Sequence, residues 1–213
     1  MTKAERQEML KERLDVMLRH ERGLWSSGRS FIAGVDEVGR GPLAGPVVAA
    51  AVILPQDFDL LGVDDSKKLS PKKREELCEA IKEKALAWSV GWVGPERIDE
   101  INILEATKEA MAQAVNGLKI RPDHVLIDGN FTVKALALPQ TAIVKGDANS
   151  TSIAAASILA KVTRDKYMEE MDAVYPGYAF ASNKGYGTKA HYDGLKAQGP
   201  CPIHRRSFIS DYL

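Results

Sequence analysis

Four acidic residues stand at points where a short apolar segment gives way to glycine-containing sequence. They are Asp36, Glu37, Asp128 and Asp147. Apolar segments of this length, rich in β-branched residues, are typical of buried strands, so each acid is expected near the end of a strand. Ligand sites of open α/β sheets form outside the carboxyl ends of the strands, and carboxylates far apart in the sequence can therefore converge there.

A metal site is the chemistry that such a cluster favours. Carboxylates that lie close together cannot all ionise without a cation between them. The set offers only oxygen ligands, with no cysteine or histidine at metal-ligand spacing, which favours Mg²⁺ or Mn²⁺ over zinc. Taken singly, the acids have ordinary alternatives: Asp36 and Glu37 as solvated charges in a hairpin turn, and Asp128 with Gly129 as a plain turn. The recurrence at three strand ends favours the metal site.

The glycines after Glu37 are expected to shape the backbone of this site. Adjacent residues of a strand point to opposite faces, so Asp36 and Glu37 can serve one site only if the backbone bends there. Gly39 and Gly41 make such a bend possible. Together with Arg40, they also present backbone amides with almost no side chain in the way, which suits close approach of a ligand backbone.

The same glycines match a second motif. Residues 39–44 fit the dinucleotide-binding pattern G-x-G-x-x-A, and Asp57 or Asp59 lies near the expected acidic position. That pattern requires a helix to begin within the glycines, whereas Pro42 interrupts it and residues 47–54 are expected to form a second strand. A dinucleotide-dependent oxidoreductase is therefore the less favoured alternative.

The surrounding sequence predicts an α/β protein. An amphipathic helix over 3–20, with seven basic and five acidic residues among the first thirty, is expected to pack as a covering arm rather than to contact nucleic acid. The other predicted strands are 47–54, 87–93, 124–128 and 141–147, and the other predicted helices are 71–86, 95–118 with a break near Asn102, and 150–175.

Two further features have alternatives that the sequence leaves open. Lys72, Lys73 and Arg74 fall in the first turn of the helix over 71–86, where cations oppose the helix dipole. Phosphate binding and an ordinary solvated loop explain this position equally well. Tyr186 lies between two glycines in a basic segment, where it could stack on a sugar or base or instead cover the core.

Composition sets the outer limits. The 213 residues, 45% of them hydrophobic, fit one sizeable domain. The longest apolar run, 47–54, is far shorter than the ~20 residues of a membrane helix, so no membrane contact is expected and the cytoplasm is the expected location. Cys78 and Cys201 are expected as free thiols. Basic and acidic residues number 29 each, so neutralising four acids with metal would leave 29 minus 25, or +4, which is compatible with a polyanionic substrate.

Six segments in a fixed order resemble bacterial ribonuclease HII. They are DEVGRGPLAGPVV at 36–48, DSKKL at 65–69, IDG at 127–129, KGD at 145–147, AAASILAKV at 154–162 and NKGYGT at 183–188. The resemblance runs from about residue 25 to about residue 206, with no departure at the catalytic positions. It implies an RNase H-like fold: a mixed five-stranded sheet with its second strand antiparallel, helices on both sides and a small helical C-terminal lobe. The implied divisions are an N-terminal helical arm (1–28), a catalytic core (29–175) and a substrate-binding lobe (176–213).

The resemblance also implies an activity. It implies an endoribonuclease that hydrolyses RNA in RNA/DNA hybrids and cuts on the 5′ side of ribonucleotides embedded in duplex DNA, leaving 3′-hydroxyl and 5′-phosphate ends. In the family's terms, two divalent ions would be held by Asp36, Glu37, Asp128 and Asp147. A hybrid-binding protein that has lost catalysis is the alternative from a different class.

The resemblance assigns substrate contacts as well. Gly39, Arg40 and Gly41 would sense the ribose 2′-hydroxyl, and Tyr186 would read the adjoining nucleotide step. Lys67 and Lys184 would contact phosphates. A monomer is expected. The tail over 206–213 is expected either to dock on the core or to contact a replication partner.

Overall fold

Strand β1 (Ile32–Val38) lies in the middle of a five-stranded sheet whose order is β3-β2-β1-β4-β5. Its neighbours are β2 (Val47–Ile53), which runs antiparallel to it, and β4 (His124–Asp128), which runs parallel. The edges are β3 (Ala87–Val93), antiparallel to β2, and β5 (Gln140–Ile143), parallel to β4. This is the mixed sheet expected from the resemblance, and the computed structural model describes it within residues 1–212, so that only Leu213, the end of the expected lobe, lies outside the description.

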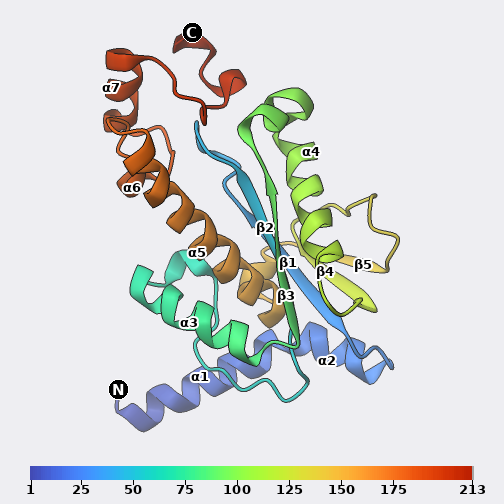
Figure 1. Ribbon diagram of the computed structural model, residues 1–213. Helices are drawn as coiled ribbons and strands as arrows, with labels where there is room; N and C mark the ends of the chain where they lie inside the picture. Colours follow the sequence, from blue (N-terminus) through green and yellow to red (C-terminus); the bar gives the residue numbers. More distant parts are fainter. Residues whose placement is uncertain (213) are drawn as a thin grey trace.

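Helices cover both faces of the sheet, as Figure 1 shows. One face packs against α5 (Thr151–Val174) and α3 (Pro71–Lys84), and the other packs against α4 (Pro95–Asn116). The residues of β2 alternate between these two cores, Ala50 and Val52 on the α5 side and Ala49 and Ala51 on the α4 side, because successive strand residues point to opposite faces. The buried β2 therefore reads as an unbroken apolar run.

Two glycines let the helices approach the sheet closely. A Cβ at Gly34 of β1 would lie 2.1 Å from the backbone carbonyl carbon of Ser152 on α5. A Cβ at Gly91 of β3 would lie 2.1 Å from the backbone oxygen of Ala110 on α4. Both approaches need a residue without a side chain, so these glycines set the depth at which α5 and α4 lie on the sheet.

The N-terminal arm packs on the core, as its amphipathic pattern predicts. The arm contains two helices, α1 (Lys3–Met17) and α2 (Arg19–Ser26), where the sequence predicts one over 3–20. Its apolar residues Leu14, Met17 and Leu18 are buried beneath α3 and α5. Glu21 of α2 is also buried, and its carboxylate accepts hydrogen bonds from the backbone amide and hydroxyl of Ser152, at 2.9 and 2.6 Å. An anion at the N-terminus of α5 is favourable, so Glu21 fixes the arm to this helix.

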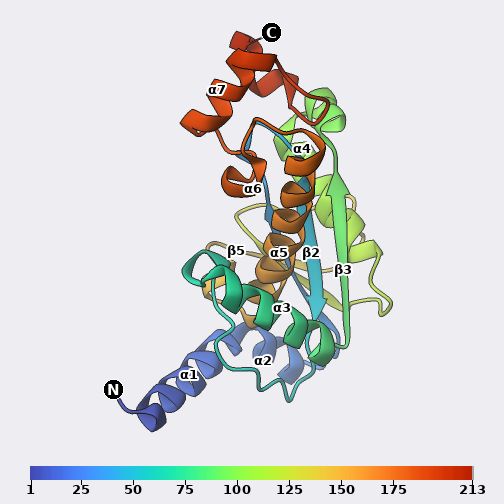
Figure 2. The ribbon, with the colours of Figure 1, turned by 60° about the vertical axis from the view of Figure 1, so that its left-hand side comes forward.

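A separate apolar cluster forms at the far end of α5. It joins Met168 of α5 to Tyr178, to α6 (Phe180–Asn183) and to α7 (Lys189–Gln198). Figures 1 and 2 show this C-terminal part and the N-terminal arm at opposite ends of α5. Four short 3₁₀ turns complete the elements: η1 (Ser66–Lys68), η2 (Gly146–Ala148), η3 (Arg206–Phe208) and η4 (Ser210–Tyr212).

The tail contributes to the same apolar cluster. Ile209 is buried in it, and the ring of Tyr212 stacks on the ring of Tyr192 with centroids 5.4 Å apart. The tail, as far as Tyr212, therefore docks on the protein's own core.

The break expected in the helix after residue 95 is confirmed at Asn102, whose φ is +68°. Within the described chain, no helix is both long enough and apolar enough to cross a membrane.

Candidate active site

Three of the four predicted acids meet at one place. Asp36, Asp128 and Asp147 each contribute a carboxylate oxygen to a group whose atoms all lie within 4.8 Å of one another. Asp36 follows the last parallel pair between β1 and β4, and Asp128 is the final residue of β4. Asp147 lies in η2, between β5 and the start of α5. The expectation that acids at separate strand ends converge is confirmed for these three.

Burial and mutual repulsion make these acids costly to ionise. Burial raises the pKa of Asp36 well above its ordinary value, and the neighbouring charges of Glu37 and Asp128 raise it further. Burial and then the charge of Asp128 also raise the pKa of Asp147, although Lys67 opposes this effect. The Asp128 carboxylate is held by the backbone amide of Gly146, 2.6 Å away, and this bond fixes it toward η2.

This donor set fits a divalent cation. A bound cation offsets both the desolvation of the carboxylates and their repulsion, which the lone acids cannot do. All three donors are carboxylate oxygens, the ligands that Mg²⁺ and Mn²⁺ prefer. A cavity of about 480 Å³, lined by Asp128, Asp147, Lys67 and Lys68, opens over the cluster and gives access from outside.

Glu37 does not join the cluster in the way the sequence predicts. The expected bend at Asp36 and Glu37 is wrong, because β1 continues in regular antiparallel register with β2 through the pair Val38 and Val48. Regular pleating directs the two acids to opposite faces of the sheet. The Glu37 carboxylate instead lies 3.5 Å from the Arg40 guanidinium. Its pKa is raised, chiefly by burial, with Arg40 lowering it and Asp128 raising it, so Glu37 remains within electrostatic reach of the cluster.

The backbone turns only after β1 ends. Gly39 has a φ of +93°, whereas Gly41 does not lie in the left-handed region. The chain then leads through bends into β2 rather than into a helix. The interpretation of residues 39–44 as a dinucleotide-binding motif is therefore wrong, because no helix begins at these glycines to hold a pyrophosphate.

Two fully buried arginines, which the sequence reasoning missed, hold this loop. Arg164 of α5 donates hydrogen bonds to the backbone oxygens of Pro46, Ala44 and Lys184, at 2.9, 3.1 and 2.9 Å. Arg205 donates to the backbone oxygens of Gly45, Arg40 and Gly39, at 2.9, 3.0 and 2.5 Å. Six carbonyls around residues 39–46 and 184 are thus bonded to two guanidinium groups.

The burial of one of these arginines can be predicted from the sequence, and that of the other cannot. Arg164 follows Ala160 and precedes Met168 at intervals of four, so helical periodicity places it on the buried face of α5. Arg205 lies in an irregular segment, and its burial depends entirely on the position of the loop that it contacts. Burial and the charge of Arg164 lower the pKa of Arg205 to about 9, and burial lowers that of Arg164 to about 10.

Tyr186 lies beside the glycine loop. A Cβ at Gly41 would lie 3.5 Å from Cε1 of the Tyr186 ring. The residue is 43% exposed, so its side chain does not cover the core. The Tyr186 backbone is anchored instead: its amide donates to Asn183 and its carbonyl lies 2.9 Å from Nδ1 of the buried His191. The structure therefore presents an exposed aromatic ring on a fixed backbone next to Gly41.

The predicted cations have different surroundings. Lys67 is highly exposed, with its ammonium 3.8 Å from Asp147 at the edge of the carboxylate cluster. Lys184 pairs with Glu169 at 2.6 Å and donates to the carbonyl of Ala181. Arg74 bonds the backbone oxygens of Ser66 and Leu69, so it stabilises the turn before α3. A loop-stabilising role, which the sequence did not suggest, explains this cation at the helix N-terminus.

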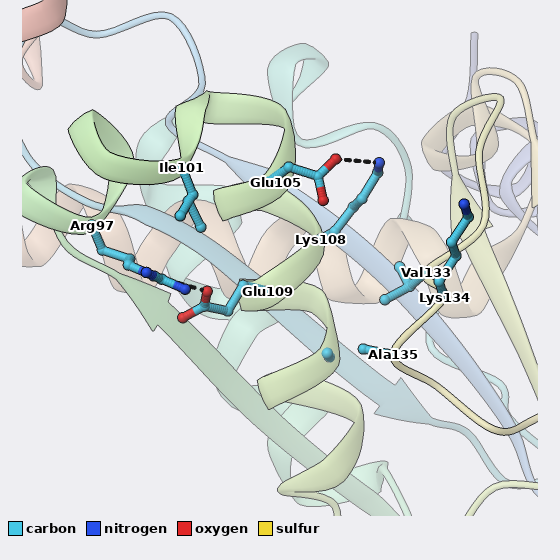
Figure 3. A pocket seen from close by; sticks show the side chains of 9 residues that line it. Arg97, Ile101, Glu105, Lys108, Glu109, Val133, Lys134 and Ala135 are labelled. Atoms are coloured by element: carbon cyan, nitrogen blue, oxygen red, sulfur yellow. Dashed lines mark hydrogen bonds and ion pairs between the residues drawn. The ribbon is translucent and has the colours of Figure 1, made fainter.

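A larger hollow lies elsewhere. A cavity of about 550 Å³ between α4 and the segment over 133–135 has no lining residue in common with the carboxylate cluster (Figure 3). Its charged side chains are largely paired with each other, Arg97 with Glu109 and Lys108 with Glu105. It therefore offers no convergent group for chemistry, and the cluster of acids remains the candidate site.

Comparison with known proteins places this site in a family. Residues 33–211 match the family model described as Ribonuclease HII. The chain is 57% identical to a ribonuclease HII of Desulfitobacterium hafniense over 197 residues, which cover 92% of this chain and 75% of that protein. It is 55% identical to a ribonuclease HII of Moorella thermoacetica over 198 residues, which cover 93% of this chain and 96% of that protein.

Solved structures agree with the sequence comparison. The chain is similar to one in the structure of the PCNA:RNase HII complex from Archaeoglobus fulgidus, with a TM-score of 0.71 and 31% identity over 82% of this chain and 93% of that chain. The matched region includes the sheet, the three converging acids and the apolar cluster beyond α5. On these grounds, the chain belongs to the ribonuclease HII family.

Proposed function

We propose that this chain is a metal-dependent endoribonuclease that hydrolyses RNA in RNA/DNA hybrids and cuts on the 5′ side of ribonucleotides embedded in duplex DNA. The products would carry 3′-hydroxyl and 5′-phosphate ends. The observation that carries this proposal is the convergence of oxygens from Asp36, Asp128 and Asp147 within 4.8 Å, in a chain of the ribonuclease HII family.

The carboxylates are proposed to hold two divalent ions, Mg²⁺ or Mn²⁺. Asp36, Asp128 and Asp147 supply converging oxygens. Glu37 is proposed to join them when metal binds, which requires that it leave Arg40 and that the end of β1 bend. When bound, such ions activate the attacking water and stabilise the leaving 3′ oxygen in an in-line displacement. The residues themselves fix the site: Gly146 orients Asp128, and the strand pairing of β1 holds Asp36 beside it.

The glycine loop is proposed to recognise the ribose. Gly39, Arg40 and Gly41 would sense the 2′-hydroxyl through their backbone, which the buried Arg205 holds in place. Tyr186 would stack on the adjoining nucleotide, and the nearness of its ring to Gly41 supports a single recognition surface.

Two lysines are proposed to contact phosphates. Lys67 is exposed at the edge of the carboxylate cavity, so it can reach a phosphate there without rearrangement. Lys184 would have to exchange its partner Glu169 for a phosphate oxygen, because the two side chains are paired at 2.6 Å. The division into an arm over 1–28, a core over 29–175 and a substrate-binding lobe over 176–213 completes the proposal.

The proposal extends to the oligomeric state, the location and a protein partner of the enzyme. We propose a monomer that acts in the cytoplasm, a location that the free thiols of Cys78 and Cys201 support. The Archaeoglobus fulgidus structure is of a ribonuclease HII with PCNA. Contact between the tail over 206–213 and a replication partner is proposed by analogy. Because Ile209 is buried in the protein's own core, such contact would use the exposed tail residues Arg206, Ser207, Ser210 and Asp211.

Three end-labelled duplexes of one sequence test the proposed activity. They are all-DNA, DNA with one ribonucleotide, and an RNA/DNA hybrid, each incubated with and without Mg²⁺ or Mn²⁺. We expect cleavage of the second and third only, strictly with metal, and on the 5′ side of the single ribonucleotide. Binding without cleavage, with both metals and across a range of pH, would show a hybrid-binding protein instead of an enzyme.

A further inference from the structure

A basic groove runs between the N-terminal arm and the segment over 61–73, which ends in the first turn of α3. Its cavity measures about 390 Å³ and is lined by Arg6 and Arg13 of α1 on one side and by Lys68 and Lys73 on the other. Asp64 is the one acid among its lining residues. The arm lies outside the region that matches the family model, which begins at residue 33.

The cations of this groove are not neutralised by their neighbours. Asp64 is shared between Arg13 at 3.1 Å and Lys68 at 3.2 Å, so one negative charge serves two positive charges. Lys73 has only a long, exposed pair with Glu76 at 3.7 Å. Within residues 1–212, no hydrogen bond or ion pair engages the exposed Arg6 guanidinium. The groove therefore carries an excess of positive charge, which attracts polyanions.

The groove adjoins the catalytic cavity, with which it shares one lining residue. Lys68 lines both cavities, and the catalytic cavity is also lined by Asp128 and Asp147. Arg13 donates a hydrogen bond of 2.8 Å to the backbone oxygen of Ala148, the residue that follows Asp147. A polyanion bound over the carboxylates thus meets the arm as soon as it leaves the cavity on this side.

We propose that the arm and the segment over 61–73 bind the phosphate backbone of the substrate duplex beyond the cleaved bond. The occupant is a nucleic-acid strand because the groove combines uncompensated cations with a position directly beside the proposed cleavage site, with which it shares Lys68. Arg6 and Lys73 are free to contact phosphates, whereas Arg13 positions the arm against η2. This inference rests on the proposed function, since it extends the same substrate along the surface.

The test compares two charge reversals on one helix. Arg6→Glu alters the groove, and Lys11→Glu makes the same charge change on α1 at an exposed residue that does not line the groove. On a long duplex with one ribonucleotide, Arg6→Glu should raise KM about fivefold and reduce the salt slope of binding by about one, as for the loss of one phosphate contact. Its kcat should match that of the wild type, and Lys11→Glu should leave KM and the salt slope unchanged.

A second measurement locates the contact. Shortening the duplex from one end at a time should abolish the difference between wild type and Arg6→Glu when the flank on the arm side is removed, and should preserve it when the other flank is removed. Equal effects of Arg6→Glu and Lys11→Glu, or a difference independent of flank length, would overturn the proposal in favour of general electrostatics. Because these outcomes presuppose cleavage by the wild type, failure of the proposed function would be seen separately, as no cleavage of any duplex.

Discussion

The guanidinium of Arg205 donates a hydrogen bond to the backbone oxygen of Gly39, at 2.5 Å, from a position near the C-terminus that is fully buried. The same group bonds the carbonyls of Arg40 and Gly45. Together, these bonds connect the tail to the loop that follows β1. Arg205, which does not belong to the carboxylate cluster, therefore holds the backbone of the loop that is proposed to recognise the ribose.

Replacing Arg205 should impair substrate recognition through the loop. Arg205→Met leaves three carbonyls without their charged donor, and we expect a loss of about 2–5 kcal/mol in the free energy of unfolding together with a raised KM. Arg205→Lys keeps the positive charge but loses the planar guanidinium that donates several hydrogen bonds, so its stability and KM should lie between those of the wild type and Arg205→Met. The exposed neighbour Arg206→Met is the control, measured by denaturant unfolding and by steady-state cleavage. Equal behaviour of the two methionine variants would contradict the role of Arg205.

The two glycines of the loop should respond differently to alanine. At Gly39, φ is +93° and a Cβ would lie 2.3 Å from Nε of Arg164 and 2.7 Å from the oxygen of Pro46. Gly39→Ala should therefore destabilise by more than the ~1–2 kcal/mol of backbone strain alone. Gly41→Ala meets only Cε1 of Tyr186, at an ordinary 3.5 Å, so it should melt like the wild type and lose only cleavage efficiency. Thermal melts and KM values separate the two outcomes.

Tyr186 should contribute to cleavage and little to stability. The residue is 43% exposed, and its backbone bonds do not depend on the side chain. We expect cleavage efficiency to fall in the order wild type, Tyr186→Phe and Tyr186→Ala, with the alanine variant losing the ~1–3 kcal/mol typical of base stacking. A large drop in melting temperature for Tyr186→Ala, with activity falling only in proportion to folded protein, would show that the residue serves packing.

Low pH should destabilise the pair of buried histidines, His191 and His204, that holds the Tyr186 backbone. Nε2 of His191 lies 2.9 Å from Nε2 of His204, and Nδ1 of His204 accepts from the Cys201 amide. This chain needs neutral rings, because a second proton would set two N–H groups against each other. Burial, and then the charge of His191, lower the pKa of His204 to about 4, below its unfolded value near 6.5.

The direction of the pH effect follows from this lowered pKa. Below about pH 6.5 the unfolded chain binds more protons than the native protein, so stability is complete above that pH and is lost as the pH falls toward 4. Between pH 7.5 and 5, wild type should lose on the order of 1 kcal/mol more than His204→Gln. Acids of the carboxylate cluster are common to both proteins, so the difference in melting temperature isolates the bonded pair of His191 and His204. Parallel pH profiles would contradict this assignment.

Much of the fold and three of the acids could be predicted from the sequence. Asp128 and Asp147 follow short apolar segments beside glycine, and parallel strands necessarily bring such ends to one edge of the sheet. The small residues near the start of α5 are compatible with its close approach to Gly34. These features are local or depend on strand direction alone, which explains why sequence patterns reveal them.

The remaining features depend on contacts between distant segments. The bend expected at Glu37 is absent because pairing of β1 with β2 persists through Val38, and no local property of the sequence determines where that pairing stops. Arg205 is recognised as a buried loop anchor only once residues 39–45 lie against it. For Arg74 the sequence left phosphate binding and a solvated loop equally open, and its bonds to the carbonyls of Ser66 and Leu69 depend on the fold of the preceding turn.

The central claim is that the acid cluster performs metal-dependent cleavage, and Asp128→Asn tests it most directly. This substitution removes one charge from the shared site and keeps the shape and the oxygen that accepts from Gly146. Single-turnover cleavage of a duplex with one ribonucleotide, measured over a titration of Mg²⁺ and of Mn²⁺, should show nearly complete loss at any fixed metal concentration. Affinity for the duplex should be equal or higher, because a negative charge near the phosphates is gone. Near-normal cleavage by Asp128→Asn, or cleavage by the wild type in chelator, would contradict the account.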